Sequence, residues 1–215
     1  MAIKVGGTEV INNARQLSNI ASVDSTTVAA LNTAGVGGGG AYELIQKQTI
    51  SSSVSNITFT NTTAPQEQLL LLFNGVKLSG QSYIRLNYQD SSGNNLTGGS
   101  YGGVYNVTAH YNDVASSHGV STENNSQNFI NLTQGANIIG GFGYNAHFFI
   151  FEWSGSGAKP HLSGRGLYRF GSNTTSFINN MIAANYASSG ATPARIYIYS
   201  GSNFTSGEIY LYKLV

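Results

Sequence analysis

The amino-acid sequence predicts an all-β protein, a jelly-roll-like β-sandwich preceded by an extended N-terminal arm with a short helix. Three observations lead to this prediction. Gly and Tyr are abundant, at 27 and 13 of 215 residues. After Ala41, β-branched and aromatic runs recur between clusters of Gly, Asn and Ser, which is typical of strands joined by turns. A run of four glycines at 37–40 separates this body from a sparser, polar segment. We therefore expect an arm at 1–40 and a β-sandwich body at 41–215.

The arm carries too few apolar side chains to form a core of its own, because so short a chain rarely folds without disulfides, metals or partners. We expect it to be an attachment and assembly element that a partner orders. A disordered tail rich in Ser and Thr is the alternative. The residues expected to make the assembly contacts are Val10, Ile11, Leu17, Ile20, Val28 and Leu31.

Two local elements are predicted within the arm. Gly6 and Gly7 separate two β-prone pieces, which indicates a tight hairpin over 5–11. Asp24 then acts as an N-cap for about two turns of helix that end at Gly35. Val28 and Leu31 would give this helix an apolar stripe suited to packing against its own copies around a symmetry axis.

The body is predicted to contain strands throughout, and no stretch after the glycine run sustains a helical period. The expected strands are 42–50, 54–60, 67–78, 82–89, 103–111, 127–132, 146–153, 165–171, 175–182, 194–200 and 207–214.

Two of these strands alternate cleanly between apolar and tyrosine side chains, at 195–199 and 208–212. Strand side chains alternate between the two faces of a sheet, so one face points inward and the tyrosines lie opposite, half covered. A loop is expected between the two strands, at 200–207. The residues predicted to face inward are Ile196, Ile198, Ile209 and Leu211.

Two other segments, 68–73 and 148–151, are apolar on both faces. Such strands are expected at the centre of a structure, with each face covered, either within the chain or against a neighbouring subunit. Two stacked sheets fit this pattern. The uneven strand and loop lengths favour a jelly-roll over an up-and-down barrel.

Composition excludes several classes of partner. Charged residues make up 9% of the chain and the net charge is +1, so no basic field is available to bind nucleic acid. No stretch approaches 18 apolar residues, so we expect no membrane insertion, and the N-terminus lacks the pattern of a secretory signal. Cys is absent, which excludes disulfides and thiolate metal sites.

No arrangement typical of catalysis is found, so we expect no catalytic residue, no metal and no cofactor, and predict that the protein is not an enzyme. The nine carboxylates are scattered singly, and Glu152 beside Trp153 is the only one next to an aromatic residue that could stack on a sugar. The four histidines lack metal-ligand spacing. The glycine run at 37–40 lacks the Lys and Ser/Thr of a phosphate-binding loop.

Ligand binding is better supported. Long stretches rich in Gly, Asn and Tyr, predicted as loops, occur at 90–103, 112–126, 134–145 and 154–164, and Tyr, Trp and Asn supply the stacking area and hydrogen bonds that suit neutral glycans. Ordinary turns are the alternative interpretation. The candidate ligand-binding residues are Tyr101, Tyr105, Tyr144 and Trp153 for stacking, with Asn94 and Asn95 as hydrogen-bond donors.

Both ends of the chain resemble parts of virion proteins. Residues 7–20, GTEVINNARQLSNI, resemble the short stalk segments of tailed-bacteriophage fibre proteins. Residues 202–212, SNFTSGEIYLY, resemble the final strand of phage virion β-sandwich domains. The middle of the chain resembles no family.

This resemblance implies a homotrimeric phage fibre protein in the virion, assembled in the host cytoplasm. The arm would contact other virion proteins, and the C-terminal domain would contact the host. From the loops rich in Tyr and Asn, we expect bacterial surface polysaccharide as the ligand of this domain. The alternative is a purely structural protein that decorates the capsid or connects the baseplate or tail and binds nothing on the host.

Overall fold

The computed structural model describes most of the body and two short pieces of the arm. The described residues are 3–5, 8–11, 41–60, 68–96, 104–111, 117–123, 129–133, 143–153, 159–169, 177–185 and 192–214. The chain divides into two units, Met1–Gly40 and Ala41–Val215. The helix predicted between Asp24 and Gly35 lies outside the described residues, as do the predicted assembly residues Leu17, Ile20, Val28 and Leu31.

The first unit contains an antiparallel pair of strands, β1 (Ile3–Val5) and β2 (Thr8–Ile11). Val5 lies opposite Thr8, and the two strands run antiparallel. The predicted hairpin is confirmed. Two of the predicted assembly residues, Val10 and Ile11, lie in β2.

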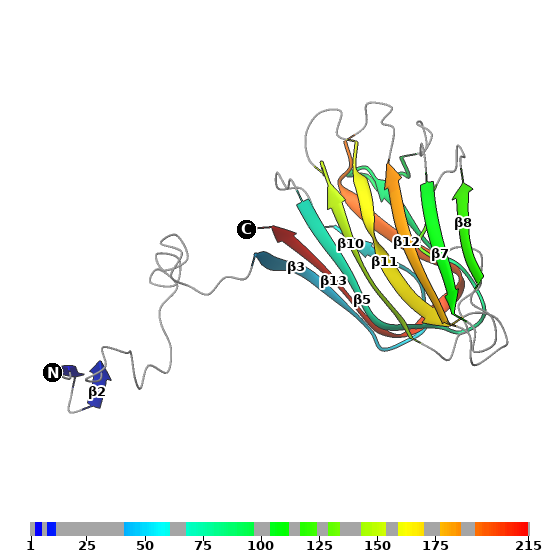
Figure 1. The fold of residues 1–215 in the computed structure, drawn as a ribbon. Coiled ribbons are helices and arrows are strands. Elements are labelled where there is room, and N and C mark those ends of the chain that lie inside the picture. Colours follow the sequence, from blue (N-terminus) through cyan, green and yellow to red (C-terminus); the bar gives the residue numbers. More distant parts are fainter. Residues whose placement is uncertain are drawn as a thin grey trace. The chain divides into compact units, whose positions relative to one another are not determined.

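The second unit is all-β, and no helix occurs among the described residues. The eleven strands that its described residues form belong to one antiparallel sheet (Figure 1). The strands are β3 (Tyr42–Ile50), β4 (Val54–Phe59), β5 (Gln68–Leu78), β6 (Ile84–Gln89), β7 (Val104–Tyr111), β8 (Ser117–Glu123), β9 (Ile130–Asn131), β10 (Tyr144–Phe151), β11 (His161–Arg169), β12 (Phe177–Asn185) and β13 (Arg195–Leu214).

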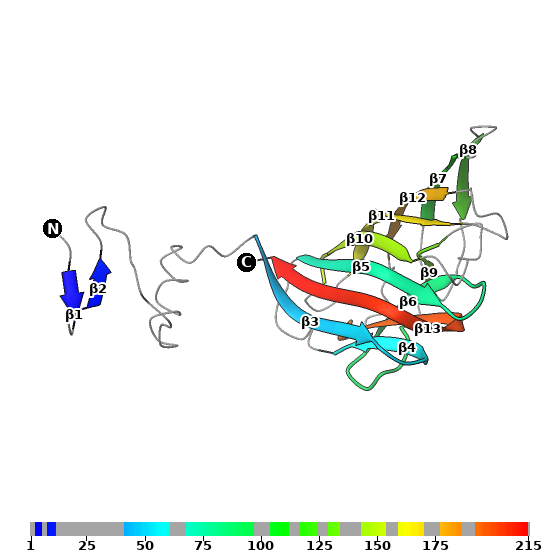
Figure 2. The same ribbon diagram turned by 90° about the horizontal axis from the view of Figure 1, so that it is seen from below.

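The 20-residue strand β13 organises this sheet. Its C-terminal part, from Phe204 onward, pairs with β5 and β3, and its N-terminal part pairs with β6 and β4. The consecutive strands β5 and β6 therefore lie along one side of β13, and β3 and β4 lie along the other side. The larger half of the sheet comprises β3, the C-terminal part of β13, β5, β10, β11, β12, β7 and β8, whereas the smaller half comprises β4, the N-terminal part of β13, β6 and β9 (Figure 2).

The two halves meet where β13 passes through residues 200–207, which were predicted to be a loop. That prediction was wrong, because partners on both sides keep this polar stretch extended. On one side, the Ser79 amide donates to the Asn203 carbonyl at 2.8 Å, and the Gly201 amide donates to Ser82 Oγ at 2.9 Å. On the other side, Asn203 Nδ2 donates to Ser53 Oγ at 2.8 Å.

A glycine is required just after this point, at Gly207. Its φ is +111°, a conformation that L side chains rarely adopt, and the register with β5 shifts on both sides of Ser206. A Cβ on Gly207 would lie 2.5 Å from Val76 Cα, which no real Cβ contact tolerates. The irregularity is therefore a β-bulge, a feature that adds local bend and twist to a strand.

The inner faces of both halves enclose one apolar core. The prediction for the two alternating strands is confirmed, since the four inward residues are fully buried and the tyrosines opposite them are half-buried. Tyr88 of β6 contacts Trp153 at the end of β10, with ring centroids 5.4 Å apart. Aromatic side chains from the two halves thus meet across the core.

Other strand predictions differ at the edges of the body. Residues 112–126 were predicted to form a loop, but β8 occupies 117–123 and pairs with β7. Strand β11 begins four residues before the predicted 165. In both cases polar or Gly-rich residues form strands because a neighbouring strand satisfies their backbone groups, which local sequence preference does not report.

Candidate binding surface

Two of the aromatic residues predicted to bind ligand belong to the core instead. Tyr144 and Trp153 are exposed by 0% and 1%. The Tyr144 hydroxyl donates to the Leu132 carbonyl at 2.9 Å, and burial raises its pKa well above the usual value. The prediction that these two rings offer a stacking surface is therefore wrong. The position of an aromatic residue at a strand end does not decide whether its ring points into the core or toward solvent.

The remaining predicted residues do not gather into one site among the described residues. Asn94 and Asn95 are exposed in the turn that follows β6. There Asn94 donates through its Nδ2 to Asp90 at 3.0 Å, and Asn95 Oδ1 accepts from Gln89 at 3.0 Å. Tyr105 lies in β7, but its side chain is not described, and Tyr101 lies outside the described residues.

Among the described residues, polar side chains and exposed apolar side chains lie side by side on the outer face of the larger half, which points away from the core. Strands β5 and β10 are neighbours in the interior of the sheet, as predicted for two-sided apolar strands. Their inner side chains are buried, whereas Leu70, Leu72 and Phe149 are only partly buried and Phe151 is 38% exposed. The expectation that each face is covered fails within one copy of the chain.

Part of this outer face forms what we call the apolar quadrant. Leu44, Tyr212, Leu70 and Phe149 lie opposite one another in a row across β3, β13, β5 and β10. The Phe149 ring lies 6.3 Å from the Tyr42 ring and 6.2 Å from the Phe151 ring, centroid to centroid. The quadrant consists of Tyr42, Leu44, Leu70, Phe149, Phe151, Tyr212 and Leu214.

Beside the quadrant lies what we call the polar groove, with a volume of about 460 Å³. The strand register explains its chemistry, because His147 of β10 lies opposite both Leu72 of β5 and Arg165 of β11. Arg165 is exposed and has no ion-pair partner among the residues described. The side chains that define the groove are Leu72, Asn74, Asn145, His147, Arg165 and Leu167.

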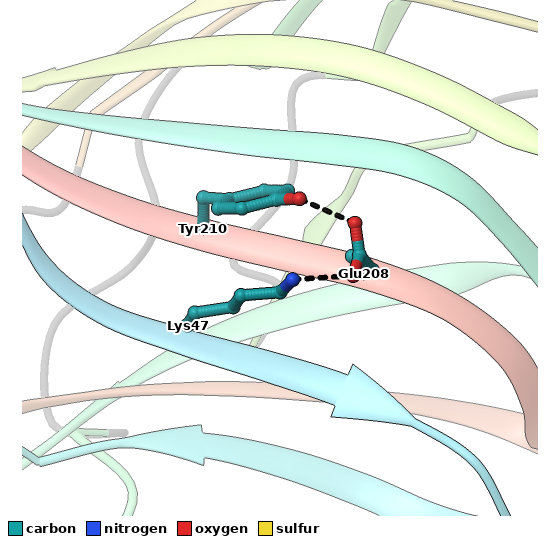
Figure 3. A network of polar contacts seen from close by, with 3 residues as sticks. All are labelled: Lys47, Glu208 and Tyr210. Atoms are coloured by element: carbon teal, nitrogen blue, oxygen red, sulfur yellow. Dashed lines mark hydrogen bonds and ion pairs between the residues drawn. The ribbon is translucent and has the colours of Figure 1, made fainter.

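A network of Lys47, Glu208 and Tyr210 adjoins the groove (Figure 3). Lys47 Nζ lies 2.5 Å from Glu208 Oε1, and the Tyr210 hydroxyl donates to the other carboxylate oxygen. The hydrogen bond from Lys47 lowers the pKa of Glu208, with help from Tyr210 and Asn74. The same contacts with Glu208 raise the pKa of Lys47 and of Tyr210. Glu208 is thus an ionised acceptor that lies directly opposite Asn74 in the neighbouring strand.

This arrangement suits non-covalent binding of a polar ligand. The guanidinium of Arg165 and the side chains of His147 and Asn74 can hydrogen-bond hydroxyl groups, and Leu72 and Leu167 offer apolar contact. Tyr210 stacks on Tyr212 at 6.1 Å with an interplanar angle of 18°, so both rings lie nearly parallel in the neighbouring strand. Flat aromatic area beside hydrogen-bonding groups is the combination expected for sugar recognition.

Glu152, the carboxylate considered for catalysis, lies apart from the groove. It is exposed, has a positive φ of 53°, and its carboxylate lies 3.6 Å from His161 Nε2. The adjacent Trp153 ring is buried and is not available to stack on a sugar beside it. Within the described part of the chain, no cluster of three or more potential metal ligands is present.

Comparisons of the chain with protein-family models, with curated proteins and with solved structures find no match. Among the described residues there is no helix of the length and hydropathy needed to cross a membrane.

Sequence reasoning missed the groove residues, because Asn74, His147 and Arg165 are isolated polar residues in three separate strands. The alternation of side chains along a strand is the signal that could have indicated this surface. Leu72 precedes the buried Phe73 and His147 precedes the buried Phe148, so Leu72 and His147 lie on the opposite, outer face.

Proposed function

We propose that this protein is a bacteriophage fibre protein, in which the arm anchors the chain to the virion and trimerises, and the body binds a glycan of the host surface in the polar groove. The resemblance of residues 7–20 and 202–212 to fibre proteins supports the virion assignment. The polar groove carries the glycan assignment, because Arg165, His147 and Asn74 converge there beside stacked tyrosines.

Binding of the full chain to purified host-envelope polysaccharide tests this proposal. Arg165→Ala should weaken binding roughly tenfold or more, because a hydrogen bond to a charged group contributes about 1.5–3 kcal/mol. Lys77→Ala is the matched control, since Lys77 is an exposed cation on β5 outside the groove. Equal affinity of wild type and the Arg165 variant, or no binding to envelope glycans at all, would contradict the glycan assignment.

The alternative is a structural role, as a capsid-decorating, baseplate or tail-connecting protein that binds nothing on the host. The apolar quadrant favours it, because exposed apolar patches on a folded protein often mark contacts with other proteins. Labelling of particles with a tagged copy, combined with a host-cell adsorption assay, separates the two. Capsid labelling without adsorption supports the structural role.

We also propose that the protein is not an enzyme. The groove contains no pair of carboxylates placed for glycoside hydrolysis. Incubation with host polysaccharide should release no oligosaccharide. Cleavage that Glu152→Gln abolishes would contradict this proposal.

The predicted jelly-roll topology stays a proposal as well. Its support is the pair of antiparallel halves that enclose one core, and an experimental structure that traces every strand connection would test it.

A further inference from the structure

Arg165 is a cation without a counter-charge on the strands around it. It lies in β11, between β10 and β12, and its side chain is exposed. The five neighbouring strands β5, β10, β11, β12 and β7 contain no Asp or Glu at any position, whereas the whole chain has nine such residues. Arg165 also forms no ion pair with the residues that the structure describes. Its charge is therefore available to an external anion.

The carboxylate of Glu208, on the strand beyond β5, is already neutralised within the sheet. Glu208 lies opposite Asn74 in the register of β13 and β5. Its carboxylate pairs with Lys47 Nζ at 2.5 Å and accepts a hydrogen bond from the Tyr210 hydroxyl. Because this ion pair adds no net charge, Arg165 sets the sign of the potential in the polar groove. A cleft lined by charge of one sign raises the local concentration of ligands of the opposite sign.

The groove places hydrogen-bonding side chains around this cation. His147 lies directly opposite Arg165. Asn145 and Leu167 lie opposite each other two positions further along the same pair of strands. Asn145 is fixed at the groove, because its Oδ1 accepts a hydrogen bond from the Gly75 amide at 2.9 Å. The volume of about 460 Å³ lies within the range of about 300–1,000 Å³ that is typical of ligand pockets, so a sugar ring fits beside the guanidinium.

The chemistry of the guanidinium indicates which kind of ligand it binds. Arg presents its N–H donors in a planar fork that matches the oxygen atoms of carboxylate and phosphate groups. Neutral sugar hydroxyls do not require this charge, since Asn and His side chains already supply donors and acceptors for them. A guanidinium without a counter-ion, in a groove whose described lining residues include no carboxylate, therefore favours an acidic ligand over a neutral one.

We propose that the polar groove selects an acidic sugar, whose carboxylate or phosphate group binds Arg165 while its hydroxyls bind His147 and Asn74. This inference rests on the glycan-binding function proposed above and specifies the class of glycan. Binding is non-covalent. A glycan of the same backbone without its acidic groups leaves the guanidinium unpaired and binds more weakly.

Three forms of the host-envelope polysaccharide test this charge requirement with the full chain: untreated, with its carboxyl groups reduced to alcohols, and with its phosphate groups removed. Removal of the recognised acid should weaken binding about tenfold or more. Loss after reduction identifies a carboxylate, and loss after dephosphorylation identifies a phosphate. Equal binding of all three forms would overturn the acidic-sugar inference and leave the glycan assignment intact. Absence of binding to every form would overturn both.

A matched pair of variants assigns the preference to the groove. Arg165→Gln and Lys77→Gln each remove one positive charge from an exposed side chain, and Lys77 lies outside the groove. Arg165→Gln should bind untreated and acid-free polysaccharide equally, whereas Lys77→Gln should keep the wild-type preference. Both should keep the wild-type circular dichroism spectrum, because the two side chains are exposed. A preference that survives in Arg165→Gln, or is lost equally in Lys77→Gln, would overturn the proposal.

Discussion

The inner and outer faces of β5 and β10 are both apolar, yet only the inner faces are closed within one copy of the chain. Leu69, Leu71, Phe148 and Ile150 are exposed by 1% or less, whereas Phe151 on the outer face of β10 is 38% exposed. The two faces alternate residue by residue along the same strands. Apolar side chains on both faces of a strand therefore predict that both faces are buried in the assembled protein, but they do not show whether the same chain or another chain buries them.

Truncation of one phenylalanine on each face of β10 should reveal the largest difference between the two faces. Phe148→Ala should lower the free energy of unfolding by about 3–5 kcal/mol, because it leaves a cavity in the core. Phe151→Ala should change it by less than about 1 kcal/mol in the dissociated chain, as surface substitutions do. Urea unfolding at low protein concentration measures both. Similar losses would show that the outer face is as closed as the inner one.

The bulge at Gly207 sets which residues of β13 face inward, so it is the next feature to test. Gly207→Ala should destabilise the fold by about 2–3 kcal/mol, because the new methyl group meets Val76 and Gly75 backbone atoms at a strained φ. Gly80→Ala is the control, since its methyl group would meet the Ser202 side chain no closer than 3.2 Å and would meet no backbone atom of a distant residue within 4 Å. Thermal unfolding compares the two variants, and equal melting temperatures would contradict the proposed requirement for glycine at the bulge.

Two tyrosines distinguish a core role from a surface role. Tyr144→Phe should cost about 1–2 kcal/mol, because the buried Leu132 carbonyl loses its hydrogen-bond donor. Tyr212→Phe on the outer face should cost less than about 0.5 kcal/mol. Chemical denaturation measures both, and glycan binding should be unchanged in Tyr144→Phe. Loss of binding in that variant would restore Tyr144 as a ligand-binding residue.

The smallest expected effect concerns pH. The pKa of Glu208 is lower in the folded chain than its usual 4.5, chiefly through the Lys47 hydrogen bond. Its stabilisation is therefore present above pH 4.5 and is lost as the pH falls through the folded pKa. Glu208→Gln should flatten the decline of melting temperature below pH 4.5 without removing it, because the pKa of Asp90 is also lowered. An identical acid profile in both proteins would contradict this role.

Many strands were predictable, because alternating apolar and polar residues indicate a strand with one buried face and one exposed face. The inward residues of β13 and the hairpin of β1 and β2 follow from period and turn residues alone. The polar stretch at 200–207 could not be predicted as strand, since its extended conformation depends on partners such as Ser79, Ser82 and Ser53, all distant in sequence.

The candidate surface was less predictable than the fold. Composition shows that Tyr and Asn are abundant, but it does not say which aromatic rings point into the core. Tyr144 and Trp153 were predicted from the sequence to stack on a ligand. In the structure both connect the two halves of the sheet, since Tyr144 hydrogen-bonds the Leu132 carbonyl and Trp153 contacts Tyr88. Conversely, Arg165 and Asn74 become neighbours of one groove only through the register of β5, β10 and β11.

Local sequence patterns therefore predict that the body is built of strands, where most of them lie, and which residues of the alternating strands face inward. These are local properties, set by side-chain period and turn chemistry. Three features became evident only from the folded structure: β13 is continuous, the sheet bends around one core, and an apolar quadrant and a polar groove share its outer face. Those outcomes depend on pairing between residues far apart in the chain, and local preference carries no information about such pairing.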